Sequence, residues 1–388
     1  MLPSIVHPYH DAAQSILGLL RGRSTVEDVM NALELHRNTL AENAHDGANI
    51  NSLLRSIAIQ SLLHTGSRSF SHFLNAVERY LPLLRNLATG GISSSGGTPS
   101  LEARMDILTA SAQFWKRNRQ IVGIVFDKLM QYQIVDPTDV VSWAFGSGFG
   151  NGEGPLKVDY RQWDLLKAAL DKANGRVTIA KRKVIALRKE EDENRARENA
   201  NGAAGGASME VDADAKPGML SIQPLSIKLN TAFPLTDDRV ESPALTTALK
   251  AFNSLTREQK SVLSRTLDGF TACLTPLLSE PNKNEFAREV IQENVWHNRI
   301  NWGIEEWNAW ETWGWYRHFC GSVRLTSHFR SLTLVCLIIT FSFQYSAYLR
   351  TFSTTLGTVS LTRIEGSTDP AAVLVKRIWN AAIGAEEG

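Results

Sequence analysis

Apolar side chains recur at intervals of three and four residues along most of the chain, which is the period of one face of an α-helix. The pattern is clearest in the N-terminal third, where successive segments each keep one apolar face. These apolar positions are Val26, Met30, Leu33 and Leu40; Ile50, Leu53, Leu54, Ile57 and Leu62; Phe70, Phe73, Leu74, Val77, Leu81, Leu84 and Leu87; Leu101, Met105, Leu108, Ala112 and Trp115; and Ile121, Ile124, Val125, Leu129 and Tyr132. The glycine- and serine-rich stretch 89–100 is expected to be a loop.

Four sites carry residue pairs that commonly begin a helix. In a capping box, the N-cap side chain and the side chain three residues later each accept a hydrogen bond from an orphan backbone N–H. A capping residue followed by proline is a second signal, because proline suits the first helical position. The sites are Ser24 with Glu27, Asp136–Pro137, Ser242–Pro243, and Thr256 with Gln259. A helix is therefore predicted to begin at each of them.

A long apolar stripe in the middle of the chain is the most distinctive local feature. Its members recur in steps of three and four over roughly four heptads. They are Tyr160, Trp163, Leu166, Leu170, Ala173, Val177, Ala180, Val184 and Leu187. The charged run 188–198 follows, and a helix over 158–198 would be about 60 Å long. The stripe fits either an arm packed on its own domain or an intermolecular coiled coil, and 199–217 is expected to be a disordered acidic tip.

Helical segments follow one another without an alternating strand pattern. The stretch 221–229 is the only plausible strand, and an extended loop explains it better. This succession predicts an all-α fold: an α-solenoid of antiparallel helix pairs, of ARM/HEAT-like repeat architecture, with a long projecting helical arm. We expect N-terminal helical pairs in 1–157, the arm in 158–217 and C-terminal helical pairs in 218–388.

The charge balance excludes a phosphate-binding field over the whole chain. The 388 residues include 41 Lys and Arg against 40 Asp and Glu, so the net charge is +1. Any contact with nucleic acid is therefore expected to be local or made by a partner. The three cysteines, Cys273, Cys320 and Cys336, have no metal-ligand spacing and are typical of a reducing compartment. The N-terminal residues lack the pattern of a secretory signal.

Motifs for catalysis and cofactor binding are not found. The sequence lacks GxxxxGK[ST], HExxH, GxSxG and paired CxxC motifs. The glycine run 146–150 is interpreted as a linker, because no strand is predicted before it. His297, His318 and Cys320 are interpreted as structural residues, since isolated His/Cys proximity on a helix is weak evidence for a nucleophile. We therefore expect no catalytic residue, no cofactor and no metal site, and the partner-binding residues stay unassigned.

Six tryptophans crowd into the stretch 296–316. Exposed, they could stack on bases or anchor a partner. Buried, they would belong to the core, and the i, i+3 spacing of Trp307, Trp310 and Trp313 favours this interpretation. Glu305, Glu306 and Glu311 make the stretch acidic and disfavour an RNA-binding platform.

A small basic cluster consists of Lys181–Lys183 with Arg188–Lys189. Such a cluster could serve nuclear import or phosphate contact. The acidic residues 190–193 follow directly and neutralise it, so the solvated face of a helix is the preferred interpretation.

Three segments carry a resemblance to a known family: 70–77, 104–108 and 114–136, with Trp143 seven residues further on. Together they resemble the third helical domain of the large subunit of the nuclear cap-binding complex, in a fungal form. The long helix from Tyr160 and its acidic tip are similar to the arm of that domain. The resemblance covers most of the chain, although the two upstream domains of the family are missing.

The resemblance implies a fold like the middle domain of the initiation factor 4 gamma scaffold, and a role without catalysis. The family's large subunit holds a small RNA-recognition-motif subunit, which stacks the 7-methylguanosine cap between aromatic side chains. Capped RNA is therefore expected to be bound indirectly. The complex serves mRNA splicing, export and nonsense-mediated decay, so processing and export factors are expected partners. The nucleus is the expected location, with the cytoplasm as a further one.

The segment 321–344 departs from the family pattern. Residues 307–320 are expected to run on into 345–356 as one helix, and this segment interrupts them. Its apolar part, 332–343, has about 12 residues, whereas a membrane-spanning helix needs about 20. We interpret it as an aberrant insertion, either translated intron or a gene-model artefact, with a membrane-associating hairpin and a buried core element as alternatives.

Two other functions stay open at this stage. One is a cytoplasmic translation-initiation scaffold of the related middle-domain family. The other is a membrane-anchored helical protein that uses 332–343, although membrane association is not expected. Binding to a DEAD-box helicase would favour the first, and tight membrane association would favour the second.

Overall fold

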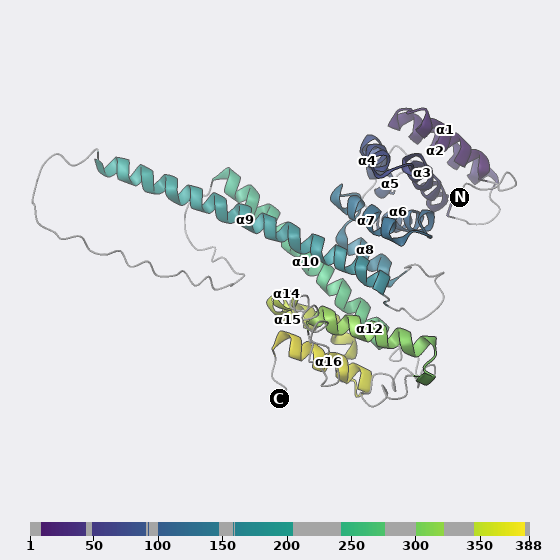
Figure 1. Ribbon diagram of the computed structural model, residues 1–388. Helices are drawn as coiled ribbons and strands as arrows, with labels where there is room; N and C mark the ends of the chain where they lie inside the picture. Colours follow the sequence, from purple (N-terminus) through teal and green to yellow (C-terminus); the bar gives the residue numbers. More distant parts are fainter. Residues whose placement is uncertain are drawn as a thin grey trace, which may run out of the picture. The chain divides into compact units, whose positions relative to one another are not determined.

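The computed structural model describes residues 9–43, 49–90, 92, 100–146, 158, 160–204, 242–275, 300–321 and 345–384 (Figure 1). Within these ranges the regular secondary structure is α-helix and short 3₁₀ stretches, with no strand. The predicted all-α fold of solenoid type is therefore confirmed. The predicted extended loop at 221–229 lies outside the described residues, as do 205–217 of the predicted tip and 322–344 of the predicted insertion.

The chain divides into two compact units. Unit 1 comprises Met1–Ala173 and Glu258–Gly388, and unit 2 comprises Asn174–Arg257. The long helices α9 (Tyr160–Ala204) and α10 (Pro243–Leu274) each contribute to both units. The boundaries of these units differ from those of the predicted segments 1–157, 158–217 and 218–388. The reason is that the first turns of α9 and the last turns of α10 pack with the terminal helices of unit 1.

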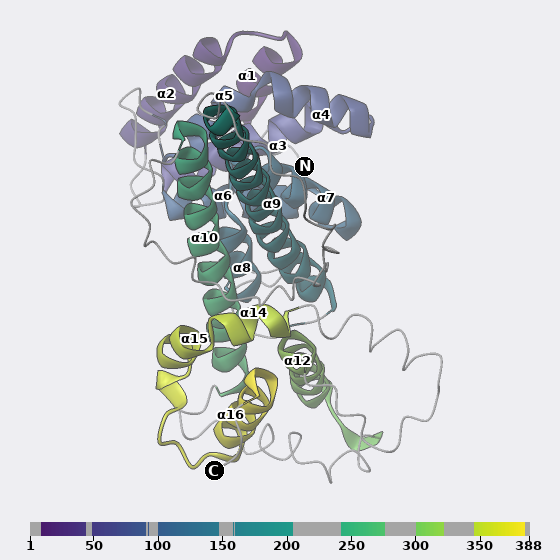
Figure 2. The same cartoon turned by 90° about the vertical axis from the view of Figure 1, so that its left-hand side faces the viewer.

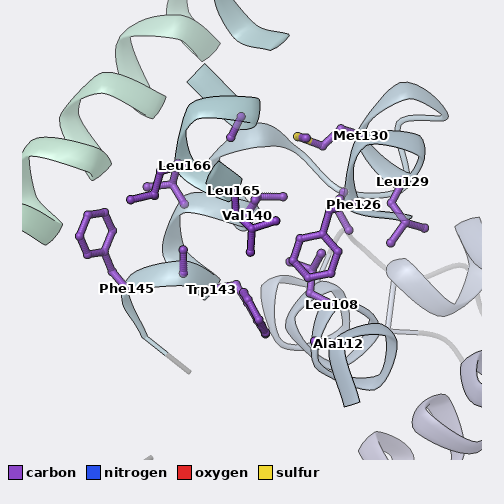
Figure 3. Close-up of a cluster of buried hydrophobic side chains, with 14 of the residues drawn as sticks. Leu108, Ala112, Phe126, Leu129, Met130, Val140, Trp143, Phe145, Leu165 and Leu166 are labelled. Atoms are coloured by element: carbon purple, nitrogen blue, oxygen red, sulfur yellow. The ribbon is translucent and has the colours of Figure 1, made fainter. Parts of the chain in front are cut away.

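Eight helices form the N-terminal part of unit 1. They are α1 (His10–Arg21), α2 (Val26–Asn43), α3 (Ile50–Gly66), α4 (Phe70–Arg79), α5 (Leu81–Ala88), α6 (Leu101–Phe114), α7 (Arg119–Gln131) and α8 (Pro137–Phe145). Helix α3 packs against α1, α4 and α6. Figure 3 shows how side chains from α6, α7, α8 and α9 meet in one cluster. Phe126 and Trp143 form its aromatic pair, with ring centroids 5.1 Å apart, and Trp143 Nε1 donates a hydrogen bond to Thr109 Oγ1 at 3.0 Å.

Two predicted helix starts differ from the structure. The capping box of α2 is one residue later than predicted: the Thr25 hydroxyl accepts the Asp28 N–H, and the Asp28 carboxylate accepts the Thr25 N–H, each at 3.1 Å. Threonine caps as serine does, so the spacing alone did not distinguish Thr25 from Ser24. No helix begins at Thr256, because α10 continues through it and the Thr256 hydroxyl donates to the Phe252 carbonyl.

The predicted helix over 70–87 is instead two helices, α4 and α5, which break at Tyr80. Pro82 lies in the first turn of α5. Proline has no N–H and its ring clashes with the carbonyl four residues earlier, so it stops α4 while it suits the start of α5. The starts at Asp136 and Ser242 are as predicted: Asp136 forms a capping box with Asp139, and Ser242 Oγ accepts the Leu245 N–H.

The C-terminal part of unit 1 contains α12 (Ile304–Cys320), α14 (Ser346–Thr351), α15 (Ser353–Ser360), the 3₁₀-helix η3 (Thr362–Ile364) and α16 (Pro370–Ile383). Helix α12 packs against α14 and α16. It ends at Gly321, which has the left-handed φ of 70° that favours glycine, and α14 begins separately after Tyr345. The helical stretches on either side of the predicted insertion are thus separate helices, α12 and α14.

Helix α10 joins the two ends of unit 1 through Phe270. Its ring lies 5.3 Å from the Phe145 ring of α8 and 5.7 Å from the Tyr316 and Phe319 rings of α12. The preceding Gly269 permits this approach, because a Cβ there would lie 2.3 Å from the Phe145 side chain. The N-terminal and C-terminal helices consequently share one hydrophobic core.

Candidate functional site

The tryptophan-rich helix α12 buries a different stripe from the predicted one. Trp313 is buried as predicted, but Trp307 is 44% exposed and Trp310 is only half-buried. The buried face continues instead through Tyr316, Phe319 and Cys320. The core interpretation is therefore correct for the C-terminal half of α12 and wrong for Trp307 at its N-terminal end.

The C-terminal half of α12 is attached to the first turns of α9 by aromatic stacking. The Trp163 and Trp315 rings are nearly parallel, at 10°, with centroids 5.2 Å apart. His318 meets the Trp163 ring edge-on at 5.2 Å. Burial lowers the pKa of His318, and the nearby Lys167 lowers it further. His318 is thus a neutral packing residue, and one face of Trp163 is already occupied by a protein ring.

The beginning of α9 is fixed by polar side chains of α12. The Val158 N–H donates to Thr312 Oγ1, and the Tyr160 N–H donates to a Glu311 carboxylate oxygen, both at 3.0 Å. The first N–H groups of a helix have no partner within it, so Glu311 caps the Tyr160 N–H, while Thr312 fixes the backbone just before the helix. Glu311, which the sequence marked only as acidic, therefore orients the start of α9. Tyr160, predicted in the apolar stripe, is 53% exposed.

The N-terminal end of α12 exposes an apolar group. Ile300 and Ile304 are 89% and 77% exposed, and they neighbour Trp302 and Trp307 along the chain. The Trp302 ring lies 5.1 Å from that of Trp307 and 5.7 Å from that of Trp310. Exposed apolar groups of this kind are frequent at protein interfaces. We name Ile300, Trp302, Ile304, Trp307 and Trp310 the α12 apolar end.

In unit 2 the apolar stripe of α9 packs against α10 of the same chain, as the intramolecular interpretation predicts. Val184 is buried with Leu245 and Ala248. The Ser242 N–H donates to Glu191 at 3.1 Å, and Ala180 and Ala251 line one groove, so α9 and α10 run antiparallel. Both views show them side by side (Figures 1 and 2). Helix α9 has 45 residues, about 70 Å, and extends to Ala204, six residues into the predicted disordered tip.

The candidate chemical groups lie in inert surroundings or outside the described residues. Burial raises the pKa of the Cys320 thiol to about 12, so it is not a thiolate at neutral pH. His297 and Cys336 lie outside the described residues, as does 147–150 of the glycine run, while Gly146 ends α8. The described ranges contain no group of three or more His, Cys, Asp or Glu side chains that could hold a metal ion.

No helix in the described part of the chain combines the length and the apolarity needed to cross a membrane. The segment 332–343, on which the membrane hypothesis depends, lies outside that part.

Ion pairs connect the N-terminal helices of unit 1. Arg55 contacts Asp106 at 2.6 Å, and Arg104 contacts Asp136 at 3.1 Å and Asp139 at 2.9 Å. Burial raises the pKa of Asp139 to about 6, although Arg104 and the Asp136 N–H act in the opposite direction. These charges hold α3, α6 and α8 together.

These features define a class of protein: an all-α protein built of stacked helix pairs. Its candidate functional surfaces are helix faces suited to contact with another macromolecule. Residues 4–324 match the sequence model of the family described as MIF4G like, which covers most of the chain, so the chain belongs to this family. The family resemblance drawn from 70–77, 104–108 and 114–136 is confirmed.

Curated relatives share the name nuclear cap-binding protein subunit 1. The Oryza sativa subsp. japonica protein is 24% identical over 180 residues, which are 46% of this chain and 18% of the relative. The Homo sapiens protein is 24% identical over 171 residues, 44% of this chain and 20% of the relative. The Aedes aegypti protein is 29% identical over 168 residues, 43% of this chain and 19% of the relative. The matched segment thus spans about a fifth of the length of these relatives.

Proposed function

We propose that this chain is a non-catalytic scaffold of a nuclear cap-binding complex. In this proposal it supports binding of the 7-methylguanosine cap by a small RNA-recognition-motif subunit. The observation that carries the proposal is the match to relatives from a plant, a vertebrate and an insect that share one name, nuclear cap-binding protein subunit 1. The family match over residues 4–324 supports it.

The packing of unit 1 suits a scaffold. Phe270, Tyr316 and Trp163 are buried among side chains from helices that are distant in sequence, so the surface helices are held by a common core. A rigid core presents a partner with contact faces that need little ordering when it binds, and this reduces the entropic cost of association. The α12 apolar end is the face that we assign to a protein partner.

The wider role follows from the same proposal. A chain that acts in a nuclear cap-binding complex works in the nucleus and serves mRNA splicing, export and nonsense-mediated decay. Its further partners are then processing and export factors, and capped RNA reaches it through the small subunit.

Affinity purification on immobilised 7-methylguanosine tests the proposal. The full chain is passed over the resin with and without the purified small RNA-recognition-motif subunit. We expect retention only when the small subunit is present, and elution by free cap analogue. Ile304→Ser with Trp307→Ser in the α12 apolar end should reduce retention about tenfold, because exposed aromatic and aliphatic anchors dominate interface energies.

A matched control changes two exposed apolar residues elsewhere, Ile179→Ser and Ile185→Ser on α9, which should leave retention unchanged. Failure of the full chain to be retained with the small subunit contradicts the proposal. Stable binding to a DEAD-box helicase in its place would support the alternative, a cytoplasmic translation-initiation scaffold.

A further inference from the structure

The ends of three helices meet at one edge of unit 1. Arg21 is the last residue of α1, and its guanidinium Nη2 lies 3.1 Å from His64 Nε2 in the last turn of α3. The His64 ring lies 6.5 Å from the ring of Phe114, the last residue of α6. The carboxyl-terminal ends of α1, α3 and α6 are therefore neighbours.

Basic residues follow each of these helix ends. We name them the basic edge: Arg21 and Arg23 at the end of α1, Arg68 after α3, and Lys116 and Arg117 after α6. All five side chains are exposed. None of them forms an ion pair within the part of the chain that the structure describes.

Four other basic residues of unit 1 do form close ion pairs. Arg55, Arg104, Lys167 and Lys172 each contact a carboxylate within 3.1 Å. Cations at helix ends do complement the helix dipole, but this effect is worth only about 0.3–1 kcal/mol at an exposed site. The helix dipole can therefore account for a single cation at a helix end, but it does not account for five cations at one edge.

Two carboxylates on α2 and α4, the helices that follow the first two helix ends in the chain, accept hydrogen bonds. The Asp28 carboxylate accepts the Thr25 hydroxyl and N–H, and the Glu78 carboxylate accepts the Tyr132 hydroxyl at 2.7 Å. Glu27 is the exposed acid nearest in sequence. The five cations of the basic edge concentrate positive charge at one place, although the whole chain carries only +1.

Arg23 occupies an unusual backbone position. The turn after α1 has the hydrogen bonds of a Schellman motif, from the Arg23 N–H to Leu20 O at 3.3 Å and from the Ser24 N–H to Leu19 O at 3.1 Å. Arg23 has a φ of 58°, the left-handed conformation that this motif usually gives to glycine. An arginine here costs backbone energy that a glycine would not, and this favours a role for its side chain.

The composition of the basic edge fits phosphate better than carboxylate-rich protein. Four of its five residues are arginines, whose planar guanidinium binds phosphate oxygens in pairs. Phe70 is 53% exposed and lies two residues beyond Arg68, and the half-buried Trp115 directly precedes Lys116. Aromatic side chains beside cations are typical of surfaces that bind single strands, because bases stack on them.

We propose that the basic edge binds the phosphate backbone of a single-stranded RNA. This inference goes beyond the proposed function, in which RNA is bound through the small subunit, and it does not depend on that subunit. It assigns to this chain a direct contact that is independent of the cap.

Fluorescence anisotropy with the full chain and a labelled, uncapped RNA of about 16 nucleotides tests the proposal. The test variant combines Arg23→Gly, Arg68→Gln, Lys116→Gln and Arg117→Gln. Arg23→Gly suits the left-handed turn, and the other three positions are exposed, so the fold should be retained. Circular dichroism and the thermal midpoint check this.

We expect the variant to bind at least about tenfold more weakly near 100 mM salt, with the slope of log K against log salt reduced by about 3, since each phosphate contact on a single strand contributes about 0.7. The matched control removes the same charge from α9 by Lys181→Gln, Arg182→Gln, Lys183→Gln and Lys189→Gln. Its affinity should stay within about twofold of the unmodified chain.

Three results would overturn the inference: unchanged RNA binding by the test variant, an equal loss in the α9 control, or displacement of the RNA by polyglutamate at equal charge concentration. The last result would indicate an acidic protein partner. Because the RNA is uncapped and the small subunit is absent, each outcome is separate from the cap-resin experiment.

Discussion

Unit 1 buries large aromatic rings contributed by helices that are distant in the sequence, whereas unit 2 is a helix pair with a small aliphatic interior. Phe270 and Tyr316 are fully buried in unit 1. In unit 2 the buried cluster of the helix pair consists of Val184, Leu245 and Ala248. A groove of about 310 Å³, lined by Leu187, alanines, Lys183 and Thr247, remains between the two helices of unit 2.

This difference in packing predicts a difference in stability between the two units. Buried area sets the hydrophobic stabilisation, so unit 1 should determine the stability of the chain. Unit 2 has few buried contacts for its length and should open locally at a lower free energy. The sequence offers a convenient probe of this contrast, because none of its 10 tryptophans lies in 174–257. Tryptophan fluorescence therefore reports on unit 1.

The largest expected effect comes from Phe270→Ala. The ring is fully buried and contacts four other aromatic rings, so its removal should lower the free energy of unfolding by about 3–5 kcal/mol. Urea unfolding followed by tryptophan fluorescence measures this. Val184→Ala in unit 2 removes two methyl groups, about 1–2 kcal/mol, and should leave the fluorescence transition in place. Equal shifts of that transition in both variants would contradict the contrast.

Breaking a buried ion pair in unit 1 should cost less than Phe270→Ala but far more than breaking an exposed pair in unit 2. Arg55 is 4% exposed, and after Asp106→Ala its one remaining carboxylate contact is with Glu102, at 3.5 Å and 63% exposed. The variant should therefore cost about 3 kcal/mol. Lys189 and Glu193 are 77% and 53% exposed and 3.7 Å apart, so Glu193→Ala should cost less than about 0.5 kcal/mol. Denaturant unfolding compares them, and similar losses would be evidence against the difference.

The buried carboxyl of Asp139 should give unit 1 a pH dependence. Burial raises its pKa from 3.8 to about 6, so between these values the folded chain holds a proton that the unfolded chain releases. This contribution to stability is complete below about pH 4 and is lost as the pH rises through about 6. Asp139→Asn does not titrate, so the stability of the unmodified chain relative to this variant should fall over that range.

Thermal unfolding of both proteins between pH 3.5 and pH 7.5 measures the relative stability. A relative stability that increases with pH would show that Arg104 and the Asp136 N–H outweigh burial.

A small effect is also expected from deleting 322–344. The Phe319 and Tyr345 rings, on either side of this segment, lie 6.2 Å apart, so a short glycine linker can join Gly321 to Tyr345. We expect the fluorescence transition of unit 1 to stay within about 1 kcal/mol of the full-length chain, because loop length changes stability only slowly. A loss of cooperative unfolding would refute the insertion hypothesis, and a cDNA that retains these codons would refute the artefact interpretation.

Most helices could be predicted because their signals are local. Helices α3, α6, α7 and α8 lie where the apolar period or a capping pair indicated them. The errors are local too: Thr25 replaces Ser24 as the cap, and Pro82 divides the predicted helix over 70–87. In each case the local sequence was compatible with two helix boundaries, and the apolar periodicity did not distinguish between them.

The candidate surfaces were less predictable. The i, i+3 spacing of Trp307, Trp310 and Trp313 shows an apolar face, but it does not show which turns a neighbouring helix covers. The sequence pattern does not predict the basic edge, because Arg21, Arg68 and Arg117 are dozens of residues apart and lie in short basic runs. No local pattern connects such positions.

The sequence by itself determined the helical class, most helix starts and the family, because periodicity, caps and family motifs are properties of short segments. Tertiary structure alone decided which faces are buried and which helix ends meet. Trp163 stacks on Trp315 across more than a hundred residues, and α8 and α12 share Phe270. These contacts depend on side chains filling one volume together, and that complementarity exists only once the chain has folded.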